Sequence, residues 1–307
     1  MESIMKVDMM ISNIKQLITL RGTPQPKTGK EMEDLSIIED GAIAIDKGKI
    51  VAVGKSPEID QNFTTPNFVN ARHKVVMPGF VDPHTHPVFV NTRENEFEMR
   101  IKGKSYVEIS QSGGGIRSSI NSVRKASEEE LFELSYKRIK KMISNGTTTL
   151  EAKSGYGLST ESEIKMLRVI KKLSDTLPID IVPTFLGAHE FPPEYKDDRE
   201  EYIRILKEDM LPEVKNQNLA EYCDIFTEDH VFSVNQSRDI LYRAKQLGFK
   251  IKMHADEIEP IGGAELAAEL GAVSADHLGA ATDRGIEAMK NSGVIATLLP
   301  GTIFSLG

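Results

Sequence analysis

The sequence has little cysteine and no long apolar run. Cys223 is the only cysteine among 307 residues, which excludes a disulfide framework within the chain and a zinc site built on cysteine thiolates. A bound metal ion would therefore need histidine, aspartate or glutamate ligands. No stretch of about 18 residues stays apolar, and the N-terminus has no basic segment followed by a long apolar one. We therefore expect a soluble, unexported, cytoplasmic protein with no membrane partner.

The sequence also lacks an excess of basic residues. It has 38 Lys and Arg against 46 Asp and Glu, a formal net charge of -8. Charges of both signs are interspersed, and no basic stripe offers a binding surface for a phosphate backbone. We therefore expect no nucleic-acid partner, and a small molecule remains the expected ligand.

The chain is longer than one typical domain, and its pattern changes near residue 75. Residues 1–74 contain short β-like runs with a Lys47-Gly48 turn, which predict a small β domain. From residue 75 to 307, apolar runs alternate with longer amphipathic stretches, which is typical of βα units around a parallel sheet. The sequence thus predicts an α/β protein with a small N-terminal domain, 1–74, and a TIM-type barrel, 75–307.

About seven βα repeats can be counted, one fewer than a closed TIM barrel needs. Ser127 is predicted to cap one helix, and Ser159 or Thr160 to open another. Polar residues end every predicted strand but the last, at the end of a barrel where active sites lie. The predicted strands are Val75–His86, Thr147–Lys153, Ile179–His189, Cys223–His230, Phe249–Glu257, Ala272–Leu278 and Val294–Leu299.

His84-Thr85-His86 ends the first of these strands. A strand projects residues i and i+2 to the same side, so the two imidazoles can bind one metal ion. An isolated pair of this kind is more often two surface histidines. Here three further histidines, His189, His254 and His277, end later apolar runs, which favours a shared site.

Catalytic zinc usually takes three protein ligands and leaves one position for water, whose pKa then falls to about 7. His84, His86 and His254 can supply these ligands, although His254 could instead be a core histidine. Glu257 could transfer a proton between the water and a substrate ring nitrogen, or be a solvated glutamate. His277 could hydrogen-bond to the attacking water or the developing oxyanion, or only support a ligand.

Several segments resemble a known family. Residues 77–87, MPGFVDPHTHP, look like the first barrel strand of the amidohydrolase superfamily. Four further segments, spread in the expected order, together resemble the imidazolonepropionase family, whose members are cyclic amidases of histidine breakdown. These segments are Gln111–Ile116, Glu151–Leu158, Gly187–Glu190 and His254–Glu257.

This resemblance implies a (β/α)8 barrel with a small β-sandwich, one Zn or Fe ion, and hydrolysis of 4-imidazolone-5-propanoate to N-formimidoyl-L-glutamate. It implies that Arg93 holds the substrate carboxylate, for which a charge-assisted fork is suited. The alternative for Arg93 is a surface ion pair with Glu94 or Glu96. The implied roles are metal ligation by His84, His86 and His254, substrate binding by Arg93, Tyr156, His189 and Glu257, and proton transfer by Glu257 and His277.

One part of the family pattern has no counterpart in the sequence. The family's further ligand is an aspartate within an Asp-x-Asn-Pro-Gly segment of the last barrel strand, and no such segment precedes Gly307. Asp283 does not replace it, because it lies at a predicted helix start. We therefore expect the last barrel strand and part of the β-sandwich to be missing, and whether the 307-residue chain is active stays open.

Two other functions fit part of the same pattern. A cytosine-deaminase-like aminohydrolase would share the histidines and the following glutamate, and an inactive fragment would account for the absent aspartate. A two-metal site is disfavoured, because no lysine lies in Asp224–His230, where such enzymes carry a carboxylated one. A homodimer is compatible with the sequence but is not indicated by it.

Overall fold

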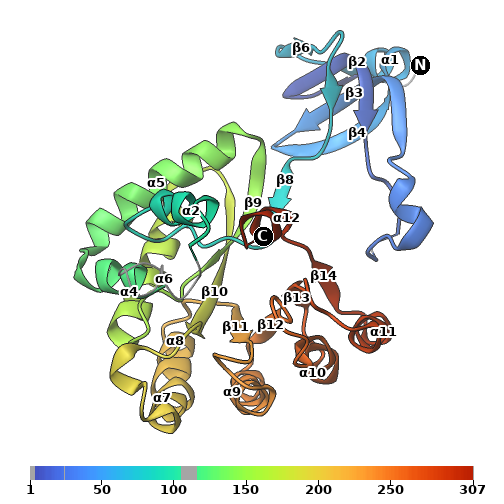
Figure 1. The fold of residues 1–307 in the computed structure, drawn as a ribbon. Coiled ribbons are helices and arrows are strands. Elements are labelled where there is room, and N and C mark those ends of the chain that lie inside the picture. Colours follow the sequence, from blue (N-terminus) through green and yellow to red (C-terminus); the bar gives the residue numbers. More distant parts are fainter. Residues whose placement is uncertain (1–3, 24, 105–115, 307) are drawn as a thin grey trace. The chain divides into compact units, whose positions relative to one another are not determined.

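The computed structural model describes residues 4–23, 25–104 and 116–306, and it divides into two compact units, Met1–Gly79 and Phe80–Gly307 (Figure 1). Most of the segment Gln111–Ile116, which contributed to the family resemblance, lies outside the described residues. No helix in the described part of the chain is both long and apolar enough to cross a bilayer. Each unit is considered by itself.

The smaller unit consists of strands with one 3-10 helix and one α-helix. Its elements are β1 (Met5–Lys6), β2 (Met9–Ile18), η1 (Gly29–Glu33), β3 (Ile37–Asp46), β4 (Lys49–Lys55), α1 (Ser56–Asn62), β5 (Phe63–Thr64), β6 (Phe68–Asn70) and β7 (Val75–Val76). The main sheet has the order β4-β3-β2-β6, β7 pairs with β2, and β1 pairs separately with β5. The strands predicted within residues 1–74 are therefore present.

The hairpin between β3 and β4 shows why this region folds as a sheet. Lys47 and Gly48 both have positive φ, 51° and 72°, as the two central residues of a type I′ hairpin turn require. Along β3, Ala42 and Ala44 pack in one buried cluster and Ile43 in another. Because successive side chains point to opposite faces, this strand is buried on both sides.

The described residues of the larger unit form seven parallel strands that lie in chain order, from β8 to β14. They are β8 (Phe80–Asp82), β9 (Thr147–Lys153), β10 (Asp180–Ala188), β11 (Tyr222–Thr227), β12 (Lys250–Ala255), β13 (Ser274–His277) and β14 (Ile295–Thr297). The sheet is curled, and most of its helices lie along its outer side (Figure 1). The prediction of an α/β fold built on a parallel sheet is confirmed.

The helices of the larger unit mostly connect one strand to the next. They are α2 (Glu94–Ile101), α4 (Ile116–Lys125), α5 (Glu128–Ser144), α6 (Thr160–Thr176), η2 (Pro193–Tyr195), α7 (Arg199–Ile205), η3 (Leu206–Met210), α8 (Leu211–Asn216), α9 (Val234–Gln246), α10 (Gly263–Leu270), α11 (Asp283–Ser292) and α12 (Pro300–Leu306). Ser127 and Ser159 cap α5 and α6 as predicted, each accepting a hydrogen bond from a backbone N–H three residues on. Asp283 is the first residue of α11, after its cap Thr282.

The first predicted strand, Val75–His86, is wrong as a single element. β7 pairs with β2 in the smaller unit, whereas β8 pairs with β9 in the larger one. Pro78-Gly79 lies between them and Pro83 follows β8; proline has no N–H to donate to a sheet. His84 and His86 therefore lie in the irregular segment after β8 and not on a strand.

Candidate active site

One cavity of about 430 Å³ lies among the segments at the carboxyl ends of the strands of the larger unit. All eight residues that the sequence predicted for the site line it, although they come from β12, β13, the N-terminus of α2 and the segments after β8, β9, β10 and β12. The lining residues are His84, Thr85, His86, Arg93, Tyr156, His189, Phe226, His254, Glu257, His277, Leu299 and Thr302.

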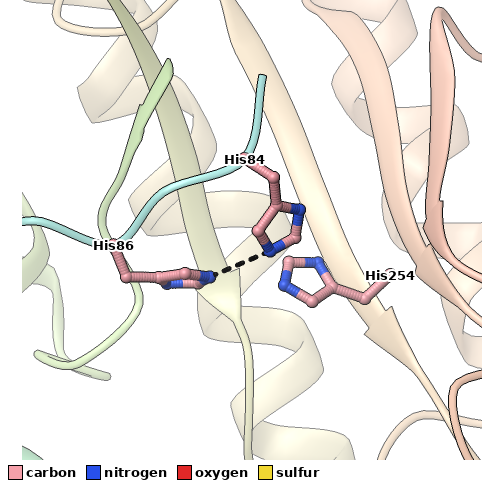
Figure 2. A group of neighbouring side chains, drawn as sticks. All are labelled: His84, His86 and His254. Carbon is pink, nitrogen blue, oxygen red and sulfur yellow. Dashed lines mark hydrogen bonds between the residues drawn. The ribbon is translucent and has the colours of Figure 1, made fainter. Parts of the chain in front are cut away.

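Three histidines converge in this cavity (Figure 2). Nε2 of His84 lies 3.4 Å from Nε2 of His86, and His254 places a ring nitrogen within 4.8 Å of both. Two nitrogens that each bind a tetrahedral zinc ion at about 2.1 Å would be about 3.4 Å apart. The spacing of His84 and His86 therefore fits a shared metal ion.

The protonation state of these histidines also fits a metal site. Burial, followed by the charges of neighbouring histidines, lowers the pKa of His86 and His254 well below the ordinary histidine value. Both rings are therefore neutral at pH 7. A neutral imidazole nitrogen is the form that binds Zn²⁺ or Fe²⁺.

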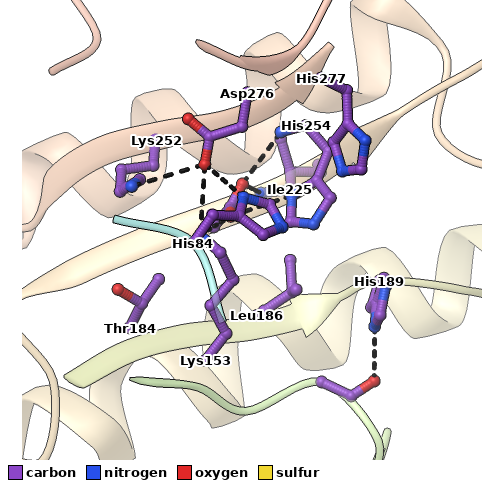
Figure 3. Close-up of polar contacts among 12 residues, drawn as sticks. His84, Lys153, Thr184, Leu186, His189, Ile225, Lys252, His254, Asp276 and His277 are labelled. Carbon is purple, nitrogen blue, oxygen red and sulfur yellow. Dashed lines mark hydrogen bonds and ion pairs between the residues drawn. The ribbon is translucent and has the colours of Figure 1, made fainter. Parts of the chain in front are cut away.

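Two buried carboxylates lie behind two of these rings (Figure 3). Nδ1 of His84 is 2.6 Å from Oδ2 of Asp276, and Nδ1 of His254 is 3.0 Å from Oδ2 of Asp224, without the alignment of a hydrogen bond. Ring nitrogens that do not bind a metal commonly face such groups, which fix the tautomer and the direction of the ring.

A buried lysine joins the two carboxylates. Nζ of Lys153 lies 2.6 Å from Asp224 and 3.5 Å from Asp276, and it is also 2.8 Å from Glu151. Burial would lower the pKa of Lys153, but the charges of Asp224, Glu151 and Asp276 outweigh it and raise this pKa above the ordinary lysine value. Lys153 is therefore a buried ammonium ion.

The same lysine argues against a second metal site. His84, Glu151 and Asp276 also come close enough together to hold an ion. However, Lys153 and Lys252 already contact Glu151, at 2.8 and 2.9 Å, and both lie within 3.5 Å of Asp276. Two ammonium groups thus occupy the positions that a cation would take, and this group is an ion-pair cluster.

Glu257 and His277 lie next to each other in the cavity. Oε1 of Glu257 is 3.3 Å from Nδ1 of His277. Burial, then the charge of Glu228, raises the pKa of Glu257 to about 7, and burial lowers the pKa of His277 to about 4. At neutral pH Glu257 can therefore both accept and release a proton, while His277 is an uncharged hydrogen-bonding group.

The loop after β9 holds Tyr156 and orients His189. Nδ1 of His189 lies 2.9 Å from the carbonyl oxygen of Gly155, so Nδ1 carries the proton and Nε2 is left as an acceptor. Gly155 has φ of 107°, and a Cβ there would lie 3.0 Å from this Nδ1. Glycine is therefore required at this position.

A buried carboxylate folds this loop. Glu163, in α6, accepts hydrogen bonds from the backbone N–H groups of Gly155, Gly157 and Leu158 at 2.8 to 3.0 Å. Its side chain is not exposed. Glu163 thus supports the backbone on both sides of Tyr156.

Arg93 completes the polar side of the cavity. Its guanidinium carbon lies 5.8 Å from the centroid of the Tyr156 ring, within the range of a cation–π contact. Nη2 donates a hydrogen bond of 3.1 Å to Oγ of Ser119 in α4. Arg93 is therefore held between the loop after β9 and α4.

Sequence reasoning gave no role to several residues around the site. Asp276 lies within the predicted strand Ala272–Leu278 and Lys153 within the family-like segment Glu151–Leu158, and the sequence predicts a role for neither. No spacing along the chain relates them, because they meet across the inside of the curled sheet. The residues without a predicted role are Ser119, Glu151, Lys153, Glu163, Asp224, Phe226, Lys252, Asp276, Leu299 and Thr302.

Comparisons with known proteins agree with this geometry. No protein-family model matches the chain. The chain is 50% identical over 305 residues to imidazolonepropionase of Alkaliphilus oremlandii, covering 98% of this chain and 72% of the relative. It is 52% identical over 306 residues to imidazolonepropionase of Fusobacterium nucleatum, covering 98% and 73%.

Among solved structures, the fold is similar to that of an adenosine deaminase from Xanthomonas campestris with bound zinc. The TM-score is 0.62 and the identity 17%, over 98% of this chain and 64% of the deaminase. The chain therefore spans less than two thirds of that structure and about 72% of the first curated relative. At this identity the likeness concerns the fold alone.

The curled parallel sheet with a cluster of histidines at its carboxyl ends, together with the curated relatives, places the chain among the metal-dependent hydrolases of the amidohydrolase type. Within that class, identities near 50% over nearly the whole chain are decisive. The chain belongs to the imidazolonepropionase family. The family resemblance found in the sequence is confirmed.

Proposed function

We propose that the chain hydrolyses 4-imidazolone-5-propanoate to N-formimidoyl-L-glutamate, a step of histidine degradation. The main support is its identity of about 50% to imidazolonepropionases. The convergence of His84, His86 and His254 in one cavity supports the metal dependence of this reaction.

We propose that these three histidines hold one Zn or Fe ion, since imidazole sites accept either metal. When bound, such an ion supplies Lewis acidity, which makes water a nucleophile at neutral pH. The cytoplasm remains the proposed location, and a small molecule the proposed partner. An eight-stranded barrel whose last strand is missing from this chain and an incomplete β-sandwich also remain proposals, and a homodimer is compatible with the chain but is not indicated by it.

The other residues of the cavity support roles in binding. The fork of Arg93 suits the propanoate carboxylate of the substrate, to which it can donate two parallel hydrogen bonds. Tyr156 and Nε2 of His189, whose rings lie side by side in the cavity with centroids 5.3 Å apart, can hydrogen-bond to the polar groups of the substrate ring. Together these three groups would hold the scissile amide near the histidine cluster.

Glu257 and His277 suit the movement of protons. Water adds to the carbonyl carbon of the ring, Glu257 accepts a proton from that water, and the C–N bond then breaks. Glu257 returns the proton to the departing ring nitrogen, so that charge and atoms balance. Neutral His277 hydrogen-bonds to the oxygen that becomes negative during the addition.

The test is to purify the 307-residue chain, measure its metal content and follow the loss of imidazolone absorbance. We expect bound metal and hydrolysis of the imidazolone, with no release of ammonia from cytosine in a parallel assay. A chain that binds metal but releases ammonia from cytosine would contradict the proposed substrate. A metal-free, inactive chain would contradict the proposal that these 307 residues are themselves an enzyme.

A further inference from the structure

The charged groups beneath the histidine cluster form one continuous chain of contacts (Figure 3). His84 contacts Asp276 at 2.6 Å, Lys153 lies 3.5 Å from Asp276 and 2.6 Å from Asp224, and Asp224 lies 3.0 Å from Nδ1 of His254. Among the described residues, Lys153 is the one cation that contacts both carboxylates. A single ammonium group, through the two carboxylates, therefore links His84 in the segment after β8 with His254 in β12.

The partners of Lys153 are otherwise fixed. Asp224 accepts hydrogen bonds from the backbone N–H groups of Ile225 at 2.7 Å and of His254 at 3.1 Å. Asp276 accepts a hydrogen bond from the side-chain hydroxyl of Ser274 at 2.7 Å. Like charges this close repel each other in a buried setting unless a cation lies between them. Lys153 thus offsets the repulsion between the two carboxylates, so that both can stay charged and in place behind the rings that they face.

Lys252 gives a comparison within the same cluster. Its Nζ contacts Glu151 at 2.9 Å and the carbonyl oxygen of Pro83 at 2.8 Å, and it lies 3.4 Å from Asp276. No contact joins it to Asp224. Lys252 therefore adds positive charge to the cluster without linking the two carboxylates that face the histidines.

We propose that Lys153 is a positioning residue for the metal site: by bridging Asp224 and Asp276 it holds the rings of His254 and His84 in the direction that metal binding needs. This inference rests on the proposed function, because it assumes that the histidines bind a metal ion. It assigns a role to the lysine of the Glu151–Leu158 segment that is separate from ligation and from substrate contact.

The experiment compares the metal affinity of the wild-type chain with that of a variant that lacks Lys153 but has the same net cluster charge. Lys153→Met alone leaves three carboxylates with one lysine, which is expected to destabilise the fold. The double variant Lys153→Met with Glu151→Gln removes one charge of each sign and keeps the net charge of the cluster. Glu151→Gln alone is the matched control, because it retains the bridge of Lys153 between the two aspartates.

Zinc affinity is measured by competition with a chromophoric chelator, and ligand geometry by the absorption of bound Co²⁺. We expect the double variant to bind zinc about ten- to a hundredfold more weakly than the wild-type chain, the usual effect of losing a group behind a metal ligand. Its Co²⁺ spectrum should change as well. Glu151→Gln should stay within a few-fold of the wild type and keep its spectrum.

Each outcome decides the matter. A double variant whose zinc affinity and Co²⁺ spectrum match those of Glu151→Gln overturns the proposal, even if its unfolding temperature is lower. If the double variant is too unstable to purify without metal, the rise of its unfolding midpoint with zinc concentration gives the same affinity. A wild-type chain that binds no zinc would instead refute the proposed metal site.

Discussion

Oε1 of Glu257 lies 3.3 Å from Nδ1 of His277. The two residues are 20 positions apart in the chain: His277 ends β13, and Glu257 lies just after β12, the neighbouring strand, whose Ala255 is in register with His277. The positive φ of His277, 76°, and of Leu278, 58°, ends β13 at this point. The pairing of β12 with β13 therefore brings the side chains of Glu257 and His277 together.

Glu257→Gln should remove the group that carries the proton while leaving the metal ligands in place. We expect kcat to fall by about 10² to 10⁴ with little change in metal content. Both are measured on the purified protein. Glu259→Gln is the control, because Glu259 is exposed and lies outside the cavity; an equal loss of kcat in this variant would argue against a specific role for Glu257.

The pH dependence of kcat/KM should report the titration of Glu257. Its pKa is raised to about 7 by burial and by the charge of Glu228. The form that accepts a proton exists above this pKa, so kcat/KM should rise with pH through about 7 and then level off.

Glu228→Gln tests the electrostatic part of this shift. The carboxylate of Glu228 accepts hydrogen bonds from the backbone N–H groups of Ile258 and Glu259, and an amide oxygen can still accept one of them. Removing the negative charge of Glu228 should lower the pKa of Glu257. The rise of kcat/KM with pH should then occur at a lower pH than in the wild-type chain. If kcat/KM of the variant rises at the same pH as in the wild-type chain, the titration of Glu257 does not control the rate.

Loss of one histidine should abolish metal binding. His254→Ala leaves His84 and His86 as the remaining imidazoles, and we expect the bound metal to fall from one ion per chain to a small fraction of that. Atomic absorption after dialysis measures it. His230→Ala is the matched control, since His230 is exposed and does not line the cavity, and it should retain its metal.

Arg93→Lys should weaken substrate binding although it keeps the positive charge. Lysine lacks the planar fork, so we expect KM to rise about tenfold or more with a smaller change in kcat. Steady-state kinetics separate the two constants. Arg72→Lys, an exposed change in the smaller unit, should have no effect; a KM unchanged in Arg93→Lys would mean that the substrate carboxylate binds elsewhere.

Glu163→Ala should destabilise the fold through the loop that carries Tyr156. Three backbone N–H groups would lose their acceptor in a buried place, which costs about 1–3 kcal/mol for each unsatisfied group. Urea unfolding measures the change. Glu161→Ala, two residues earlier and exposed, provides the control and should have a much smaller effect.

The sequence predicted much of the larger unit because its strands are short apolar runs with polar ends. The predicted strand Thr147–Lys153 is β9 residue for residue. Since parallel strands place their carboxyl ends together, residues as far apart in the chain as His84 and His277 could be expected to meet. The eight predicted residues do line one cavity, and their individual roles stay predictions.

The sequence could not reveal the cluster around Lys153. Lysine, glutamate and aspartate on a strand look like solvated residues when the chain is read alone, and here they are buried because the sheet curls around them. The break between β7 and β8 at Pro78-Gly79 was also missed, because it lies within an apolar run, Val75–Val81. Both features depend on contacts between segments that are distant in the chain, and the hydrophobic periodicity of the sequence does not predict such contacts.

The chain order of the strands in the larger unit has a consequence for biosynthesis. Among the described strands, each from β9 to β13 pairs with the one before it and the one after it, so a strand leaving the ribosome meets an edge that has already been made. Assembly can therefore follow the direction of translation. The first two proposed metal ligands, His84 and His86, emerge long before His254, so if these residues bind the metal the nascent protein should acquire it late.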